Sequence, residues 1–472
     1  MSDNLPIQPK GYTLTRFNLV MRDEYDPDSK LSELDGGTDK IDLRNVCSGW
    51  NYIESINSPS VRMEFAIYDT VDLISTLTGN EVIQITIETD SAPGAALEIE
   101  QRIFKIGNVV KSERSVAYMI YTVSPETHNN ETNKVFKVFK DNLGSEHVNW
   151  IIENKLKTFG KHNIVEPTKG NFNFIAPTWR AFDCISYISD KVVSSITGTA
   201  GYVFFENKNG YNFSSIDFLC SDRNTTKTKP LKFTYEQANV GESDFNAYKI
   251  EQLMFPDRAN HLEKMRSGTY SNAVLGLKVP SLTSGNLDNP GDGGTETTDT
   301  KDVKGGGGSI KEPMHMGLDK VFGVAKEAEG ILNDTFPYPK INPKLFEDTR
   351  PTRTKIRALP GMKDSKGMTD STGGAGNMDF DTVWASAYTF SRYNLLNAIT
   401  LDITVPGNVG LYVGMVIQIN IPASSKEEER TIEDPIYSGL YLITGLRHKS
   451  VSYTHLRAHE TVLDLVCRLL LE

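Results

Sequence analysis

The stretch VRMEFAIYDTVDLISTLTGNEVIQITIE, residues 61–88, decides the fold class of this chain. Its first half alternates apolar and polar side chains, which is the period-2 pattern of a strand with one buried face. After Gly79-Asn80, a typical turn pair, the alternation resumes at Ile83, Ile85 and Ile87. We therefore expect two half-buried strands joined as a hairpin, within a β-rich protein.

The same pattern occurs again near the other end of the chain. Residues 399–421, ITLDITVPGNVGLYVGMVIQINI, alternate before and after a Gly-Asn break, and VIQITI at 82–87 returns as VIQINI at 416–421. Two strands can converge on six similar residues because their composition is alike. The matching flanks favour an internal duplication instead.

The last segment, VSYTHLRAHETVLDLVCRLLLE at 451–472, resembles the translation of a sequencing adapter. We expect residues 451–472 to be an artefact and the natural protein to continue past Ser450. His455 and His459, with Glu460 beside them, have helical metal-ligand spacing but would then form a false site. Cys467 is discounted for the same reason.

Composition limits the function. A chain of 472 residues accommodates about two to four domains. Its formal net charge of −11 argues against a surface that grips nucleic acid. There is no apolar run of membrane length and no signal peptide, which predicts a cytoplasmic protein without membrane insertion. Cys47, Cys184 and Cys220 are odd in number and widely spaced, which predicts reduced, buried thiols.

The expected fold class is α+β and β-rich, with two duplicated antiparallel tube-like β-barrel domains and an α+β domain between them. The α+β domain should contain two helices, one around Val148 and one capped by Thr178, then a hairpin turning at Asn209-Gly210. Its KVFKVFK stretch, 134–140, is expected to be helical with solvated lysines. The expected boundaries are 10–124 for the first barrel, 125–222 for the α+β domain, and 223–279 with 379–450 for the second barrel and a strand-helix-strand segment.

Between the two parts of the second barrel lies an insertion, 280–378, much of it made of Ser, Gly, Asp and Thr. Such segments bury too little apolar surface to offset the entropy of ordering, so we expect the insertion to be mostly flexible. Its KGGGGS run at 304–309 lacks the end of a phosphate-binding loop and is predicted to be a linker. The second barrel is expected to lack a closing strand equivalent to residues 115–123.

No catalytic constellation is present. The chain has no G-x-S-x-G elbow, H-E-x-x-H, P-loop or dinucleotide fingerprint. Asp379 and Asp381 could hold a cation, but a turn is the better interpretation. We predict no catalytic, cofactor-binding or metal-binding residues, and we expect the remaining histidines to be ordinary surface residues: His128, His147, His162, His261, His315 and His448.

With the repeat, the helix and hairpin at 179–219 and the segment 406–445, the chain resembles the central baseplate hub of T-even-like contractile-tailed phages. The resemblance implies a non-enzymatic homotrimer located in the virion tail and assembled in the host cytoplasm. Each subunit would contribute two barrels to a pseudo-sixfold ring. Its partners would be the tail spike or tail lysozyme protein, the tail tube and other baseplate proteins, with DNA passing through the lumen without sequence-specific binding.

Two alternatives belong to other classes. One is a tail-associated hydrolase of the cell envelope, with its active site in the α+β domain; acidic residues in a deep pocket there would favour it. The other is a spike or hub component of a contractile secretion system, which gene neighbours would identify.

Overall fold

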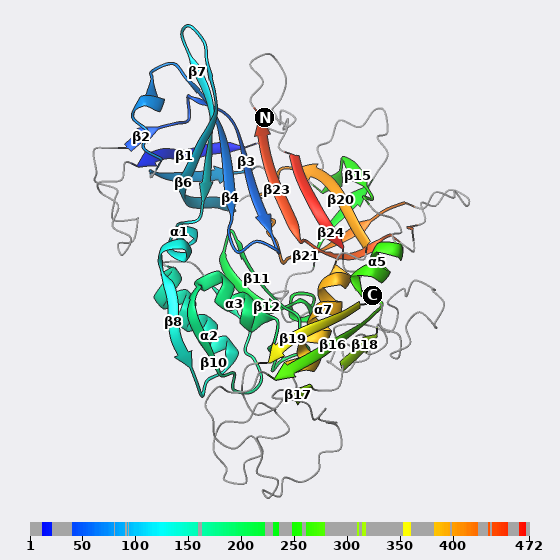
Figure 1. Cartoon of the computed structure of the whole chain (residues 1–472). Coiled ribbons are helices and arrows are strands. Elements are labelled where there is room, and N and C mark those ends of the chain that lie inside the picture. Colours follow the sequence, from blue (N-terminus) through cyan, green and yellow to red (C-terminus); the bar gives the residue numbers. More distant parts are fainter. Residues whose placement is uncertain are drawn as a thin grey trace, which may run out of the picture.

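The computed structural model describes seventeen separate stretches of the chain. They are residues 12–20, 40–79, 81–89, 92, 94–158, 163–221, 230–235, 248–256, 261–278, 309–310, 314–317, 353–359, 382–396, 399–422, 433–434, 437–451 and 462–468. Strands predominate, and an eleven-stranded sheet lies above a helix-containing layer (Figure 1). The β-rich fold class is therefore confirmed.

The N-terminal unit is a curled sheet wrapped around its own hydrophobic core. Its strand order is β3-β4-β7-β6-β5-β1-β2, with every pairing antiparallel. The alternation of Met63, Phe65 and Ile67 places all three side chains in that core. The strands are β1 (Thr13–Val20), β2 (Lys40–Asp42), β3 (Cys47–Ser55), β4 (Arg62–Asp69), β5 (Val82–Glu88), β6 (Ala96–Lys111) and β7 (Val116–Val123).

The expected hairpin within residues 61–88 is wrong. The two strands exist, but β4 pairs with β3 and β7, whereas β5 pairs with β1 and β6. The connection between them contains the short helix η3 (Leu73–Ser75), so it is a crossover and not a tight turn. The second copy departs in the same way, because β20 (Ile399–Pro406) pairs with other strands than β21 (Val416–Asn420) does.

The layer beneath the sheet is the α+β unit (Figure 1). The hairpin at Asn209-Gly210 is confirmed, with Gly210, at φ 146°, as the first residue of its second strand. Helix α2 is also confirmed and continues as the π-helical turn η4. The elements are α1 (Pro125–Thr132), β8 (Lys134–Phe139), α2 (Gly144–Ile151), η4 (Ile152–Leu156), β9 (Ile164–Val165), β10 (Phe174–Arg180), α3 (Ala181–Ser189), β11 (Tyr202–Asn207), β12 (Gly210–Ser215) and α4 (Ile216–Leu219).

Two local expectations in this unit are wrong. The KVFKVFK stretch forms strand β8, because Val135 and Phe139 face the core at even spacing and Lys137 lies over the Trp150 ring, 3.5 Å from its centroid. Thr178 caps no helix, since it sits at φ 61° at the irregularity in the β8–β10 ladder, and α3 begins at Ala181.

The C-terminal unit joins the first one edge to edge. Strand β23 pairs with β3 over seven residues, so strands from both ends of the chain form one sheet (Figure 1). Strand β24 pairs with β20 and β23, in the position expected to lack a closing strand, and that expectation is therefore wrong for this chain. The adapter origin of 451–472 stays a prediction. The further strands are β13 (Leu231–Tyr235), β14 (Lys249–Ile250), β15 (Gln252–Met254), β22 (Gly439–Leu442), β23 (Gly445–Val451) and β24 (Val462–Arg468).

A small sheet crosses the expected domain boundaries. Its central strand, β16, pairs with three strands from residues 280–378, while the rest of that insertion lies outside the described residues. Side chains of β16 and most of those buried on α7 pack into the core of the α+β unit, whereas Tyr393 and Leu396 at the end of α7 pack into the core of the C-terminal β unit. The remaining elements are α5 (His261–Ser267), β16 (Ser271–Lys278), β17 (Ser309–Ile310), β18 (Met314–Gly317), β19 (Arg353–Leu359) and α7 (Thr382–Leu396).

A glycine pair tests how tightly the units pack. Gly414 has φ 90°, and a Cβ there would lie 2.9 Å from the Phe205 ring of the α+β unit. Gly79 has nearly the same φ, 87°, with nothing within 4 Å of the added atom. We expect Gly79→Ala to cost about 1 kcal/mol from backbone strain, and Gly414→Ala to cost about 1–3 kcal/mol more. Equal losses in chemical denaturation would show that the contact with Phe205 is not tight.

Candidate functional site

Buried carboxylates gather where the units meet. Glu54, Glu206 and Asp217 have at most 2% of their surface exposed, although ionised side chains are rarely buried without partners. Each receives hydrogen bonds from a different part of the chain. Together they form the junction that holds the two β units against the α+β unit.

Glu54 connects all three units. It belongs to β3, and its Oε1 accepts hydrogen bonds from the Tyr52 hydroxyl at 2.5 Å and from the Lys208 amide at 2.6 Å. Its Oε2 accepts from the Val413 amide at 2.7 Å. Lys208 lies in the β11–β12 turn, and Val413 precedes β21 in the C-terminal unit. Burial raises the pKa of Glu54 to about 7, an effect that these hydrogen bonds oppose.

Glu206 ties the same hairpin to the N-terminal unit. This residue lies in β11 and accepts hydrogen bonds from the Val61 amide, at 2.9 Å, and from the Ser124 hydroxyl. Val61 immediately precedes β4, and Ser124 immediately follows β7. The hairpin therefore contacts the ends of two neighbouring strands of the curled sheet.

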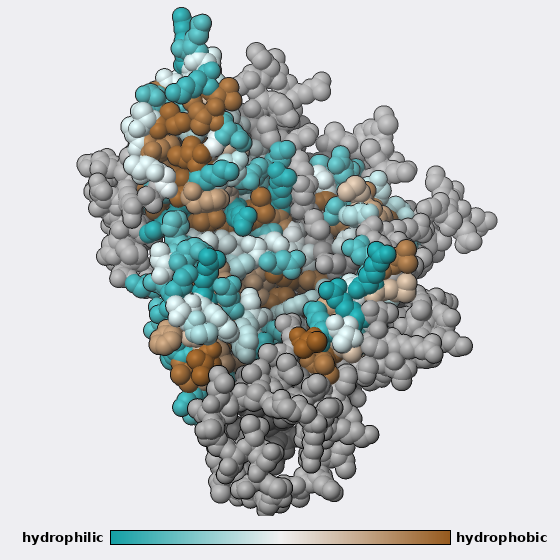
Figure 2. Space-filling model, in the orientation of Figure 1, coloured by the Kyte–Doolittle hydropathy of each residue, from teal (hydrophilic) through white to brown (hydrophobic). Residues whose placement is uncertain are grey.

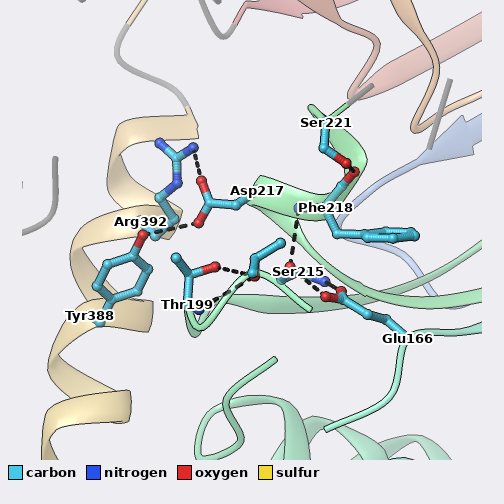
Figure 3. Close-up of polar contacts among 9 residues, drawn as sticks. Glu166, Thr199, Ser215, Asp217, Phe218, Ser221, Tyr388 and Arg392 are labelled. Atoms are coloured by element: carbon cyan, nitrogen blue, oxygen red, sulfur yellow. Dashed lines mark hydrogen bonds and ion pairs between the residues drawn. The ribbon is translucent and has the colours of Figure 1, made fainter. Parts of the chain in front are cut away.

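Asp217 connects the α+β unit to α7 (Figure 3). Its Oδ1 lies 2.5 Å from an Arg392 guanidinium nitrogen, and its Oδ2 accepts from the Tyr388 hydroxyl at 3.0 Å. The side chains of both ion-pair partners are fully buried. Burying such a pair costs desolvation energy, and removing one partner leaves an uncompensated charge in the core.

Glu166 adds a second layer of support beneath Asp217 (Figure 3). It accepts hydrogen bonds from the Ser194 hydroxyl, from the Ser215 amide at 2.5 Å and from the Ser215 hydroxyl at 3.2 Å. Ser215 also caps α4, since its hydroxyl accepts from the Phe218 amide at 3.1 Å. Burial raises the pKa of Glu166 to about 7. The network therefore fixes the start of the helix that carries Asp217.

This arrangement has the chemistry of a structural cross-link. Donors from the chain itself occupy the carboxylates, whereas a general acid or base must face its substrate. Within the described stretches, no group of three or more His, Cys, Asp or Glu residues could hold a metal ion. No helix in those stretches is both long and apolar enough to cross a membrane.

The sequence predicted no site residue, and it misjudged two histidines. His147 is buried, with Nε2 2.7 Å from the Phe172 carbonyl oxygen. His448 is buried in β23, and burial, helped by the Lys208 charge, lowers its pKa to about 3. His162, Asp379 and Asp381 lie outside the described residues. Cys47, Cys184 and Cys220 are free thiols. Cys184 and Cys220 are buried as predicted, whereas Cys47 is only half-buried.

One junction residue was visible in the sequence. Trp50, Tyr52 and Glu54 occupy alternate positions of one strand, so the period-2 rule places Glu54 on the buried face. A carboxylate on the buried face of a strand needs hydrogen-bond partners, so its presence there indicates a buried polar contact. Nothing comparable marks Asp217 or Arg392, which come together from 175 residues apart.

The pH dependence of stability tests whether the pKa of Glu54 is raised in the folded protein. Its folded pKa, about 7, is above the ordinary 4.5, so its contribution is full below about pH 4.5 and is lost as pH rises through about 7. His448 acts in the opposite sense, so the useful quantity is the difference between wild type and Glu54→Gln. We expect the stability advantage of wild type to shrink by about 2–3 kcal/mol from pH 5 to pH 8 in urea denaturation. Exposed Glu113→Gln should show no such trend, and a constant difference for Glu54→Gln would refute the buried-acid interpretation.

A double-mutant cycle tests the buried ion pair. We expect Arg392→Met to lower the free energy of unfolding by about 3–5 kcal/mol, because Asp217 is left charged and buried. Asp217→Asn with Arg392→Met should recover a large part of that loss. If the double variant were as unstable as the sum of the single variants, the pair would not be coupled.

Comparisons with known proteins place the fold. No protein-family model and no curated protein sequence matches the chain. Among solved structures, it resembles the tail protein from Neisseria meningitidis MC58, with a TM-score of 0.51, 11% identity and 97% of each chain covered. It also resembles the 43 kDa tail protein of prophage MuSo2 from Shewanella oneidensis, with a TM-score of 0.47, 8% identity, and 96% and 97% of the two chains covered.

A third resemblance is to a type VI secretion system component from E. coli, described as structurally similar to two bacteriophage T4 tail proteins. The TM-score is 0.38, with 8% identity, and 90% of this chain and 73% of the other are covered. Identities this low speak to the fold alone. The chain therefore has the fold of the Neisseria tail protein along nearly its whole length.

Proposed function

We infer that this protein is a structural component of a phage tail baseplate, the hub that joins the tail tube to the cell-puncturing spike. The observation that carries this inference is the β3–β23 ladder, which fuses two curled β units into one sheet. The shared fold with the Neisseria tail protein supports it across 97% of both chains.

The two β units follow one pairing scheme, which supports a duplication. In the N-terminal unit, β4 pairs with β7, β7 with β6, and β6 with β5. In the C-terminal unit, β20 pairs with β24, β24 with β23, and β22 with β21. Strands β22 and β23 correspond to the two halves of the long β6, interrupted at Ile443 and Thr444. The units differ beyond this scheme, because β1 is antiparallel to β5 and to β2, whereas β13 is parallel to β21 and to β14.

A chain with two equivalent units can solve a symmetry problem. Three copies present six similar surfaces to a hexameric tube, while the rest of each chain keeps threefold symmetry for a trimeric spike. The proposed partners are therefore two further copies, the spike or tail lysozyme protein, the tube and other baseplate proteins. The proposed location is the virion tail, after assembly in the host cytoplasm. DNA would pass through the lumen without being read, in keeping with the net charge of −11.

The buried carboxylates of the α+β unit argue against the hydrolase alternative. The buried acids of the described α+β unit are Glu126, Glu166, Glu206 and Asp217. The last three accept hydrogen bonds from donors of the chain itself. The proposed hub has no enzymatic role. A hub in a contractile secretion system would share this architecture, and the gene neighbours distinguish the two settings.

Light scattering with size-exclusion chromatography tests the proposed trimer. We expect three copies of the 52.6 kDa chain in the species measured, either alone or together with its spike partner. A strict monomer in both conditions, at concentrations up to about 100 μM, would contradict the symmetry-adapter function. Release of cell-wall fragments by the purified protein would instead favour the hydrolase.

A further inference from the structure

The outer half of β6 is an open sheet edge. Residues 96–102 of this strand pair with β5 on one side, and residues 102–111 pair with β7 on the other. Within the described ranges, no strand pairs with the second edge of β6 beyond Ile103. Phe104, Val109 and Val110 there are 48%, 46% and 66% exposed. Hydrophobic surface gathers on this unit just below the hydrophilic tip of the β6–β7 hairpin (Figure 2). Such an edge can accept another strand.

A second open edge lies at the far end of the same sheet. Strand β15 is the terminal strand there and pairs only with β20 in the described structure. Met254 in this strand is 58% exposed. In the described structure, each β unit therefore has an open strand edge of this kind, the outer half of β6 in the N-terminal unit and β15 in the C-terminal unit.

The chain already contains the joint that these edges could make. Strands β4 and β20 carry the repeated sequence. Strand β7 pairs with β4 and with the outer half of β6, just as β24 pairs with β20 and with β23. Strand β23 therefore corresponds to the outer half of β6. On the other edge of each repeated strand, β3 pairs with β4 and β15 pairs with β20, so β15 corresponds to β3. The β23–β3 ladder thus occurs once within the chain. The counterparts of its two strands, the outer half of β6 and β15, occur again and are not paired with each other in the described residues.

We propose that the outer half of β6 in one copy pairs antiparallel with β15 in a second copy, reproducing the β23–β3 ladder between subunits. This inference rests on the proposed function for the number of copies, which is three. The joint is heterologous, so copies add head to tail until the ring closes. Pro256 follows β15 closely and cannot donate to the ladder, which keeps the joint short.

The register follows from the repeat. Aligning Val61 with Ile399 places Asp402 at the position of Glu64. Asn51 faces Glu64 in β3–β4, and Met254 faces Asp402 in β15–β20, so Met254 stands where Asn51 does.

The same alignment fixes the other side of the joint. It matches Pro406 with Tyr68, and these two residues face Val462 and Ala117. Lys449 faces Val462, and Val110 faces Ala117, so Val110 stands where Lys449 does.

The β23–β3 ladder within the chain then shows which two residues would face each other between copies. Lys449 faces Asn51 within the chain, so Val110 of one copy faces Met254 of the next. Two exposed apolar side chains become cross-strand neighbours, and the open backbone edges become hydrogen-bonded. Closure therefore removes both the apolar surface and the free strand edges.

Paired cysteines test this register directly. Residues directly opposite in an antiparallel ladder have Cα atoms about 4.5–5.5 Å apart, which a disulfide can span. We expect Val110→Cys with Met254→Cys to give, after mild oxidation, reducible covalent species of two and three chains and none larger. The matched control is Val71→Cys with Met254→Cys, since Val71 is 74% exposed on the same unit but outside the register.

Light scattering on the same samples separates the two proposals. A trimer in which only the Val110/Met254 pair cross-links supports the joint. A trimer without that cross-link, or with equal cross-linking of the control pair, overturns the joint and leaves the hub function standing. A monomer with and without the spike protein contradicts both.

Discussion

The Glu54 carboxylate has been removed from water, so its stability depends on donors that only the folded chain supplies. Those donors come from β3 itself, from the β11–β12 turn and from the segment before β21. Glu54 also lies opposite Leu446 in the β3–β23 ladder, so the polar contact and the ladder lie at one place. The carboxylate is satisfied only when all three units are in position, and it therefore couples their orientations.

The other buried charges extend the same constraint. Glu206 holds the α+β hairpin to the ends of β4 and β7, and the Asp217–Arg392 pair holds α4 to α7. Buried ion pairs add little net stability compared with apolar packing, but they tolerate few alternative geometries. We infer that these contacts fix angles between units. The proposed ring, which would meet sixfold and threefold partners at once, would need such rigidity more than extra stability.

Alternation identified the strands because one face of each is buried, and it revealed the repeat at 61–88 and 399–421. It could not identify strand neighbours, because β4 and β5 meet their partners through contacts distant in sequence. KVFKVFK was misassigned to a helix because its lysines suggested solvent, whereas Lys137 packs over Trp150. At the junction, the phase of Glu54 was readable from the sequence, but the meeting of Asp217 with Arg392 depends on the tertiary fold.

In the proposed hub, one chain supplies two equivalent ring positions, so that three chains match six. Electron microscopy of the assembled oligomer, viewed end-on, measures this most directly. We expect strong sixfold rotational power at low resolution that resolves at higher resolution into threefold symmetry, with β3–β23 and β6–β15 ladders alternating around the ring. A threefold assembly without a sixfold component, in which the two β units face different partners, would contradict it.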